Sequence, residues 1–135
     1  MAHAKFPAEL LTPEGELFND EVELVSTRTA VGSIGVLAHH TPVLAMLDPT
    51  ELRLYKTESE VVRFAQAEGY MQVADGRVML LVEEAHPPSE LDQRSLQERL
   101  DRAERELQDA GEDSERRRVA QRDKRRWETF LRLAS

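Results

Sequence analysis

The chain contains no cysteine among its 135 residues. This absence excludes disulfide bonds, thiolate zinc sites and cysteine nucleophiles. Aromatic residues are scarce, at 5%, and no apolar run approaches the roughly 18 residues needed to span a bilayer. Residues 1–5 lead straight into Phe6-Pro7 without the apolar stretch of a signal peptide. We therefore expect a soluble, intracellular protein.

Positive charge is also in short supply. The chain has 18 Lys and Arg against 26 Asp and Glu, a net charge of −8. This balance argues against binding to nucleic acid, which needs a basic face, and against direct adhesion to anionic lipid. Charged residues reach 33% and apolar residues only 40%. Because a compact core needs a larger apolar share, part of the chain is predicted to be elongated and solvated.

Catalytic motifs are missing as well. The sequence has no phosphate-binding Gly-x-x-x-x-Gly-Lys-Ser/Thr, no Gly-x-Gly-x-x-Gly and no Gly-x-Ser-x-Gly. His39 and His40 would point in opposite directions on an extended segment, which favours a polar surface loop over a metal site. The abundant acidic pairs are explained by a solvated surface. We therefore expect no catalytic residue, no metal ligand and no resident cofactor.

The remaining charge is unevenly distributed. Residues 1–88 carry 6 basic and 14 acidic residues, whereas residues 89–135 carry 12 of each. Within the second part, residues 89–113 have a net charge of −5 and residues 114–135 of +5. The sequence thus predicts two domains, 1–88 and 89–135, and two helices of opposite charge in the second domain that can lie against each other.

The first domain has the pattern of strands. Residues 21–26 and 51–56 alternate polar and apolar side chains, and residues 60–67 and 77–82 are further strand candidates. Turn signals separate them, among them Gly-rich residues 32–35 and the Asp75-Gly76 pair, which suits a two-residue type I′ hairpin. Short strands without intervening helices predict an antiparallel β-sandwich or flattened barrel, so the fold class is α+β.

The second domain has the pattern of a helical hairpin. Pro87-Pro88 ends the sheet, Ser89 is the expected N-cap of the first helix, Gly111 is expected to end it and Ser114 to cap the second. Apolar residues recur at helical spacing. The first stripe consists of Leu91, Leu96, Leu100, Ala103, Leu107 and Ala110, and the second of Val119, Ala120, Trp127, Phe130, Leu131 and Ala134.

A basic cluster in the second helix is the sharpest electrostatic feature. It consists of Arg116, Arg117, Arg118, Arg122, Arg125 and Arg126, with Lys124 among them. Two interpretations stand side by side. The cluster is either a solvated helix face balanced by the acidic first helix, or a docking surface for an acidic partner.

Two segments carry a resemblance to a known family. Residues 32–44 read GSIGVLAHHTPVL, and residues 69–85 read GYMQVADGRVMLLVEEA. Both closely resemble signatures of the epsilon subunit of bacterial and chloroplast F-type ATP synthases. The order of sandwich, proline break and helical hairpin is similar too. The alternative from a different class is a free-standing β-sandwich adaptor or ligand-binding domain with a helical interaction arm.

The resemblance implies a non-catalytic rotor subunit of the central stalk. Its sandwich would pack on the gamma subunit and the ring of c subunits, and so couple rotation to ATP synthesis. Its hairpin would either fold down on the sandwich or extend along gamma. In the extended form it would inhibit ATP hydrolysis, and the basic second helix would suit the acidic C-terminal segment of a catalytic beta subunit in the alpha/beta assembly. Such a chain would sit at the cytoplasmic face of the bacterial plasma membrane as a peripheral part of the complex.

The resemblance also carries individual residues over. Gly32, Ser33 and His40 match the ring-facing loop, with Ser33 where some members have Glu. Some members bind ATP as a regulatory ligand at the start of the hairpin. Leu91 and Asp92 match the start of that family motif, whereas Ser95 replaces its arginine. Arg102 and Arg125 are further candidates, since either could still reach a phosphate.

Overall fold

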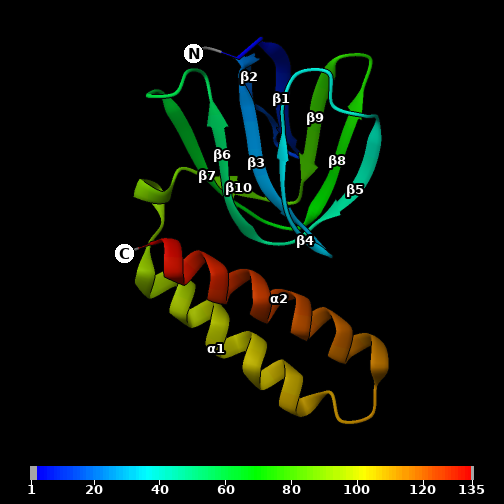
Figure 1. Ribbon diagram of the computed structural model, residues 1–135. Coiled ribbons are helices and arrows are strands. Elements are labelled where there is room, and N and C mark those ends of the chain that lie inside the picture. Colours follow the sequence, from blue (N-terminus) through cyan, green and yellow to red (C-terminus); the bar gives the residue numbers. More distant parts are fainter. Residues whose placement is uncertain (1–2, 135) are drawn as a thin grey trace. The chain divides into compact units, whose positions relative to one another are not determined.

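Strands make up the first part of the chain and helices the second (Figure 1). The structure is a computed structural model that describes residues 3–134. The chain divides into two compact units, Met1–His86 and Pro87–Ser135, and the division lies two residues before the predicted domain boundary. Each unit is described by itself below. No helix among residues 3–134 is long and apolar enough to cross a membrane.

The first unit is one curled sheet of ten strands among the described residues. The order is β10-β7-β6-β3-β5-β8-β9-β1-β2, and β4 pairs with β3. The strands are β1 (Phe6–Thr12), β2 (Gly15–Val22), β3 (Leu24–Thr29), β4 (Gly32–Val36), β5 (Val43–Leu47), β6 (Thr50–Tyr55), β7 (Val61–Gln66), β8 (Gly69–Ala74), β9 (Arg77–Val82) and β10 (Ala85–His86). The predicted sandwich is confirmed. One feature was not predicted: β1 and β9 pair in parallel, with Leu10 opposite Leu80.

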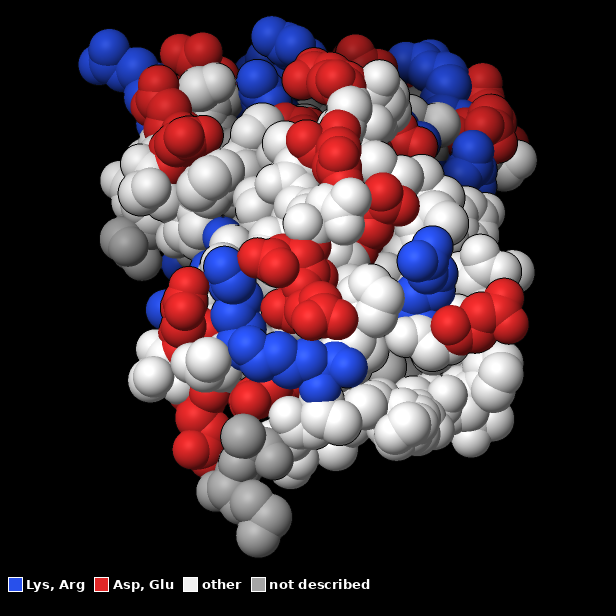
Figure 2. Space-filling model, turned by 90° about the horizontal axis from the view of Figure 1, so that it is seen from above, with Lys and Arg blue, Asp and Glu red and all other residues white. Residues whose placement is uncertain are grey.

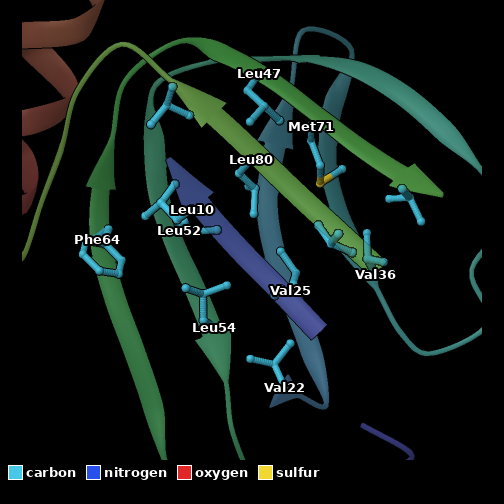
Figure 3. Close-up of a cluster of buried hydrophobic side chains, with 14 of the residues drawn as sticks. Leu10, Val22, Val25, Val36, Leu47, Leu52, Leu54, Phe64, Met71 and Leu80 are labelled. Atoms are coloured by element: carbon cyan, nitrogen blue, oxygen red, sulfur yellow. The ribbon is translucent and has the colours of Figure 1, made fainter. Parts of the chain in front are cut away.

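Apolar side chains fill the inside of the curled sheet (Figure 3). Leu10, Leu52, Leu54, Met71 and Leu80 are fully buried. They come from β1, β6, β8 and β9, so strands distant in the sequence share one core. Each such burial contributes about 1.5–3 kcal/mol. The sandwich therefore has a core of its own.

One polar side chain is fully buried next to this core. The Thr27 hydroxyl donates to Gln66 Oε1 at 2.5 Å, and Gln66 Nε2 donates to the carbonyls of Asp48 and Ala67 at 3.0 and 3.1 Å. A buried amide is tolerated when its donors and acceptor are satisfied. Gln66 thus joins β7 to β3 and to the turn before β6.

The Asp75-Gly76 turn is confirmed. Asp75 has φ 54° and Gly76 φ 74°, the left-handed values that a type I′ turn requires at both positions. The pair joins β8 to β9, and Val73 lies opposite Val78 in the hairpin.

The expectation of one strand over residues 21–26 is wrong. The chain bends at Glu23 between β2 and β3, where the Glu23 amide donates to the Tyr55 carbonyl at 2.7 Å. Val22 and Val25 are fully buried and Leu24 only partly. The bend shifts the alternation by one residue because β2 pairs with β1, whereas β3 pairs with β4 and β6.

The expected turn at residues 32–35 is also wrong. These residues belong to β4, and the turn is made by the two residues before them, Ala30 and Val31. Thr29 fixes this register, since its hydroxyl donates to the Gly32 carbonyl at 2.9 Å. Gly32 has φ 139°, a value that glycine adopts readily. The glycine therefore meets the backbone conformation at the first residue of β4.

The second unit contains a 3₁₀ turn (Pro88–Glu90) and the helices α1 (Gln93–Asp109) and α2 (Ser114–Leu133). The predicted caps were wrong at both helices. Ser89 lies inside the 3₁₀ turn, and Asp92 caps α1 by accepting from the amides of Arg94 and Ser95 at 3.0 and 3.4 Å. At α2 the Asp113 carboxylate accepts from the Arg116 amide at 3.1 Å, which leaves Ser114 as the first helical residue.

The two helices pack along the predicted apolar stripes. Leu96, Leu100 and Ala103 of α1 are buried, as are Ala120, Trp127 and Phe130 of α2, together with the unpredicted Thr129. Gly111 has φ 54° and allows the chain to reverse.

An aromatic cluster strengthens one part of this pairing. Trp127 and Phe130 form an edge-to-face pair at 5.8 Å, and the Arg99 guanidinium of α1 lies 4.9 Å from the Trp127 ring. Arg99 therefore links α1 to α2 through a cation–π contact.

Candidate functional site

The three ring-facing candidates do not share one loop. Gly32 and Ser33 begin β4, whereas His40 follows the turn beyond the other end of that strand. A strand rises about 3.3 Å per residue, so the two ends of β4 lie about 13 Å apart. His40 makes a local contact, with Nδ1 2.6 Å from the Thr41 carbonyl. The expected single loop is corrected to two sites at opposite ends of β4.

An exposed apolar surface on the sheet was missed by the sequence argument. Leu44 and Met46 of β5 are 71% and 63% exposed, and Tyr70 of β8 and Leu81 of β9 are about half exposed. The register places Met46 opposite Tyr70, and Tyr70 opposite Leu81, so these three side chains form a row across three strands. We call Leu44, Met46, Tyr70 and Leu81 the apolar sheet face.

Such a surface is unusual on a strongly charged chain. Figure 2 shows Asp and Glu residues spread among Lys and Arg, beside an area where neither occurs. Contiguous exposed apolar side chains are typical of surfaces that bind a protein, a membrane or a ligand. In the sequence, the run VLAML at residues 43–47 could have indicated this apolar surface, because it places apolar side chains on both sides of one strand.

The six arginines of the basic cluster do not lie on one face of α2. A shallow groove is lined by Arg118, Arg122 and Arg125, which are spaced four and three residues apart along the helix. Arg116, Arg117 and Arg126 lie outside this groove. Leu107, Gln121, Lys124 and Glu128 line the same groove. We call Arg118, Arg122 and Arg125 the basic stripe.

Ion pairs moderate the charge of the cluster. Arg118 makes a bidentate contact with Glu115, 2.7 Å at its shorter bond, and this hydrogen bond holds the pKa of Glu115 below its usual range. Arg122 lies 3.1 Å from Asp123. Exposed pairs of this kind are weak, so the arginines can exchange their partners.

The other arginines of the cluster serve the hairpin itself. Arg116 reaches Glu106 of α1 at 3.6 Å, and Arg117 donates to the Gly111 carbonyl at 3.3 Å. Arg126 lies over the Trp127 ring at 5.2 Å, where burial lowers the pKa of its guanidinium. Arg116, Arg117 and Arg126 thus have partners within the hairpin, whereas the basic stripe lines the open groove.

The four nucleotide candidates are not brought together. Asp92 is engaged as the N-cap of α1, and Arg102 follows ten residues later, about 15 Å along the helix. Arg125 lines the groove beside Leu107, and Leu91 precedes the helix. We therefore propose no nucleotide site. Residues 3–134 also contain no group of three or more His, Asp or Glu side chains that could hold a metal ion.

Fold and surface together define a class: a β-sandwich with an exposed apolar face, followed by a helical hairpin. Comparison with known proteins identifies the family. Residues 5–88 match the family model of the ATP synthase delta/epsilon chain β-sandwich domain. The ATP synthase epsilon chain of Rubrobacter xylanophilus is 39% identical, covering 81% of this chain and 77% of that protein. The epsilon chain of Sulfurihydrogenibium is 31% identical over 94% and 95%. The chain therefore belongs to the ATP synthase epsilon chain family.

Solved structures share the fold. A chain of the Euglena gracilis mitochondrial ATP synthase, from a structure of its OSCP, F1 and c-ring parts, superposes with a TM-score of 0.80 at 24% identity, covering 98% of this chain and 82% of that chain. A chain from the central stalk and c-ring of the Tetrahymena thermophila enzyme gives a TM-score of 0.64 at 16% identity, with both chains covered completely. At these identities the likeness concerns the fold alone.

Proposed function

We propose that this chain is a non-catalytic rotor subunit of ATP synthase, in which the sandwich attaches to the gamma subunit and the ring of c subunits and helps to transmit rotation. The apolar sheet face is the observation that carries the proposal. Its exposed Leu44, Met46, Tyr70 and Leu81 need a partner that shields them from water. Family membership favours this role over a free-standing adaptor domain.

Attachment through the sandwich also accounts for the location that we propose. Membership in the complex would hold the chain at the cytoplasmic face of the membrane as a peripheral part. A net charge of −8 disfavours direct binding to anionic lipid, so the chain would be held there by the other subunits.

Co-purification from native membranes tests this attachment. A tagged chain is expected to recover gamma, the c subunits and the catalytic alpha and beta subunits together. The Tyr70→Asp variant should recover several-fold less, because it places a carboxylate in the apolar sheet face. Ser59→Asp, in an exposed turn between β6 and β7, is the matched control and should recover as much as the wild type. A wild-type chain that recovers neither gamma nor c subunits would refute the proposal.

For the hairpin we propose a regulatory role, the inhibition of ATP hydrolysis by α2. The basic stripe is complementary to an acidic segment of a catalytic subunit. The pairing of α1 with α2 relies on thin apolar stripes, so two docked arrangements of the hairpin can differ by only a few kcal/mol. A partner that binds the basic stripe then selects one of them.

Charge reversal on the stripe tests this role. In the assembled enzyme, Arg122→Glu combined with Arg125→Glu is expected to raise the rate of ATP hydrolysis. The control is Arg105→Glu, an exposed arginine of α1 outside the stripe, which should leave the rate unchanged. Equal hydrolysis by the stripe variant and the wild type would exclude inhibition through these arginines.

A further inference from the structure

The outer face of the sheet has a hollow beside the apolar sheet face. The hollow has a volume of about 130 Å³, and its lining includes Glu9, Arg77 and Met79. Arg77, Met79 and Leu81 occupy every second position of β9, so their side chains point to the same side of the sheet. Because Leu81 belongs to the apolar sheet face, the hollow and that face form one continuous surface.

Two opposite charges in this hollow are unpaired. Glu9 is partly buried and Arg77 is exposed, and neither side chain forms an ion pair or a hydrogen bond with another residue of the described chain. Glu9 lies opposite Met79 on the neighbouring strand. It is therefore one strand across and two residues along from Arg77, about 8 Å away between Cα atoms. A partner that satisfies both charges must bring a cation to Glu9 and an anion to Arg77.

The size of the hollow limits what can fill it. Pockets for small-molecule ligands have volumes of about 300–1,000 Å³, so this hollow suits protein side chains instead. The chain itself carries a cation and an anion at the required spacing. A two-fold rotation places Arg77 of a second copy over Glu9, and Glu9 of the second copy over Arg77, as in an isologous contact.

The same rotation brings two apolar sheet faces together. The axis must lie in the plane of the contact, midway between Glu9 and Arg77 and perpendicular to the line that joins them. With the sheet treated as flat, strands about 4.8 Å apart and a rise of about 3.3 Å per residue place the centre of the apolar sheet face within about 2 Å of that axis. By the strand register, Tyr70 then lies over Leu44 of the second copy, and Met46 lies over its own counterpart.

The free edge of the sheet is a poorer place for two copies to meet. The edge strand β2 pairs only with β1, and its exposed side chains include Glu16, Asp20 and Glu21. The register between the two strands also shifts in the middle of β2, which marks a bulge. Like charges and bulges both oppose the pairing of two edge strands, so the outer face is the favoured contact.

We propose that the free chain forms a weak two-fold dimer, in which the apolar sheet faces cover each other and Glu9 pairs with Arg77 of the second copy. The dimer shields the apolar sheet face from water before the chain is assembled into a complex. Exposed ion pairs contribute little, so the subunits of the complex can replace the second copy. The proposal goes beyond the proposed function because it concerns the chain before attachment.

Sedimentation equilibrium of the isolated full chain tests the dimer. The mean mass should rise from 15.4 kDa toward twice that value between about 10 and about 500 μM chain, the range in which a weak dimer forms. Glu9→Lys and Arg77→Glu should each raise the dimer Kd at least about tenfold, because each places like charges opposite each other. Ser59→Asp, in the β6–β7 turn, is the control and should leave the Kd unchanged.

Mixing the two charge variants gives the sharpest result. In a mixed dimer the introduced lysine faces the introduced glutamate, and the original Arg77 faces the original Glu9. The Kd of the mixture should therefore return to within about threefold of the wild-type value. A variant that failed to fold could not be rescued by mixing, so the recovery separates pairing from folding.

The opposing outcomes are distinct. The dimer would be overturned by a wild-type chain that stays at 15.4 kDa throughout, or by a mixture that stays monomeric although both variants keep the wild-type urea midpoint. Tyr70→Asp should abolish the dimer, and a dimer that persists in this variant would contradict burial of the apolar sheet face. Recovery of gamma and c subunits by the tagged chain is a separate measurement, which decides the proposed function and leaves the dimer to the sedimentation result.

Discussion

The sandwich and the hairpin differ in how their apolar side chains are buried and exposed. The sandwich buries a core drawn from strands distant in the sequence, such as Leu10 of β1 opposite Leu80 of β9, and still exposes the apolar sheet face. Among the described residues of the hairpin, no large apolar side chain is exposed. The sandwich therefore combines a closed core with a surface suited to permanent attachment.

The hairpin has the opposite character. Its contacts join two helices that follow each other in the chain, and its surface ion pairs, such as Arg118 with Glu115, are exposed. Such an element gains little from any single contact and can exchange one set of partners for another. Under the function proposed above, the sandwich would be the fixed attachment and the hairpin the movable arm.

The largest expected effect is the loss of stability when one buried leucine in each unit is replaced by alanine. Leu80→Ala should destabilise the sandwich by about 3–5 kcal/mol, because a fully buried leucine leaves a cavity that both faces of the core must line. Leu96→Ala should destabilise the hairpin by about 2 kcal/mol, since a helix pair can partly collapse around the smaller side chain.

Two natural probes separate these measurements. The only tryptophan, Trp127, belongs to the hairpin, and both tyrosines, Tyr55 and Tyr70, belong to the sandwich. In urea unfolding, Leu80→Ala should shift the tyrosine transition and Leu96→Ala the tryptophan transition. If each substitution shifted both transitions equally, the two units would share one cooperative core and the comparison would fail.

A smaller effect concerns the ends of the helices. Asp92→Ala and Asp113→Ala should each lower the stability of the hairpin by about 1 kcal/mol, because each carboxylate caps a helix. Ser89→Ala, at the position favoured by the sequence pattern, should change it by less than about 0.5 kcal/mol. The tryptophan transition reports all three. A loss at Ser89 as large as at Asp92 would mean that α1 begins earlier than described.

The smallest effect is the dependence on pH. A hydrogen bond from Lys56, 3.0 Å away, holds the pKa of Asp20 below its ordinary value of 3.8, and Arg118 lowers the pKa of Glu115 in the same way. A lowered pKa in the folded state adds stability above the unfolded pKa, about 4, and this is lost as the pH falls through the folded value.

Each unit thus has one pair to test. Asp20→Asn should flatten the acid-side pH dependence of the tyrosine transition, and Glu115→Gln that of the tryptophan transition. Both changes should be small, because both pairs are exposed. Acid-side profiles identical to the wild type would show that neither pair contributes to stability.

Local chemistry made part of the fold predictable. The Asp75-Gly76 turn, Gly111 after the first helix and the paired apolar stripes depend on neighbours in the sequence, and all three are confirmed. The bend at Glu23 was not predictable in this way. It arises because adjacent strands pair with different neighbours, which only the folded sheet determines.

The candidate site was likewise only partly predictable from the sequence. The basic cluster was visible in the sequence, but the selection of Arg118, Arg122 and Arg125 as one stripe needed the extent of α2. The apolar sheet face needed the strand register that places Met46, Tyr70 and Leu81 in a row. Both helix caps were missed for a subtler reason: Asp and Ser are both good caps, and the pattern did not decide between neighbours.

Removing the hairpin tests the central claim most directly. In the assembled enzyme, a chain ending at Pro88 is compared with the full chain by measuring ATP hydrolysis per complex and the amount of chain retained. We predict that the shortened chain stays bound at the same ratio, because the sandwich makes the attachment, and that hydrolysis rises. Loss of the shortened chain from the complex, or unchanged hydrolysis with the chain retained, would contradict the division into a fixed sandwich and a regulatory arm.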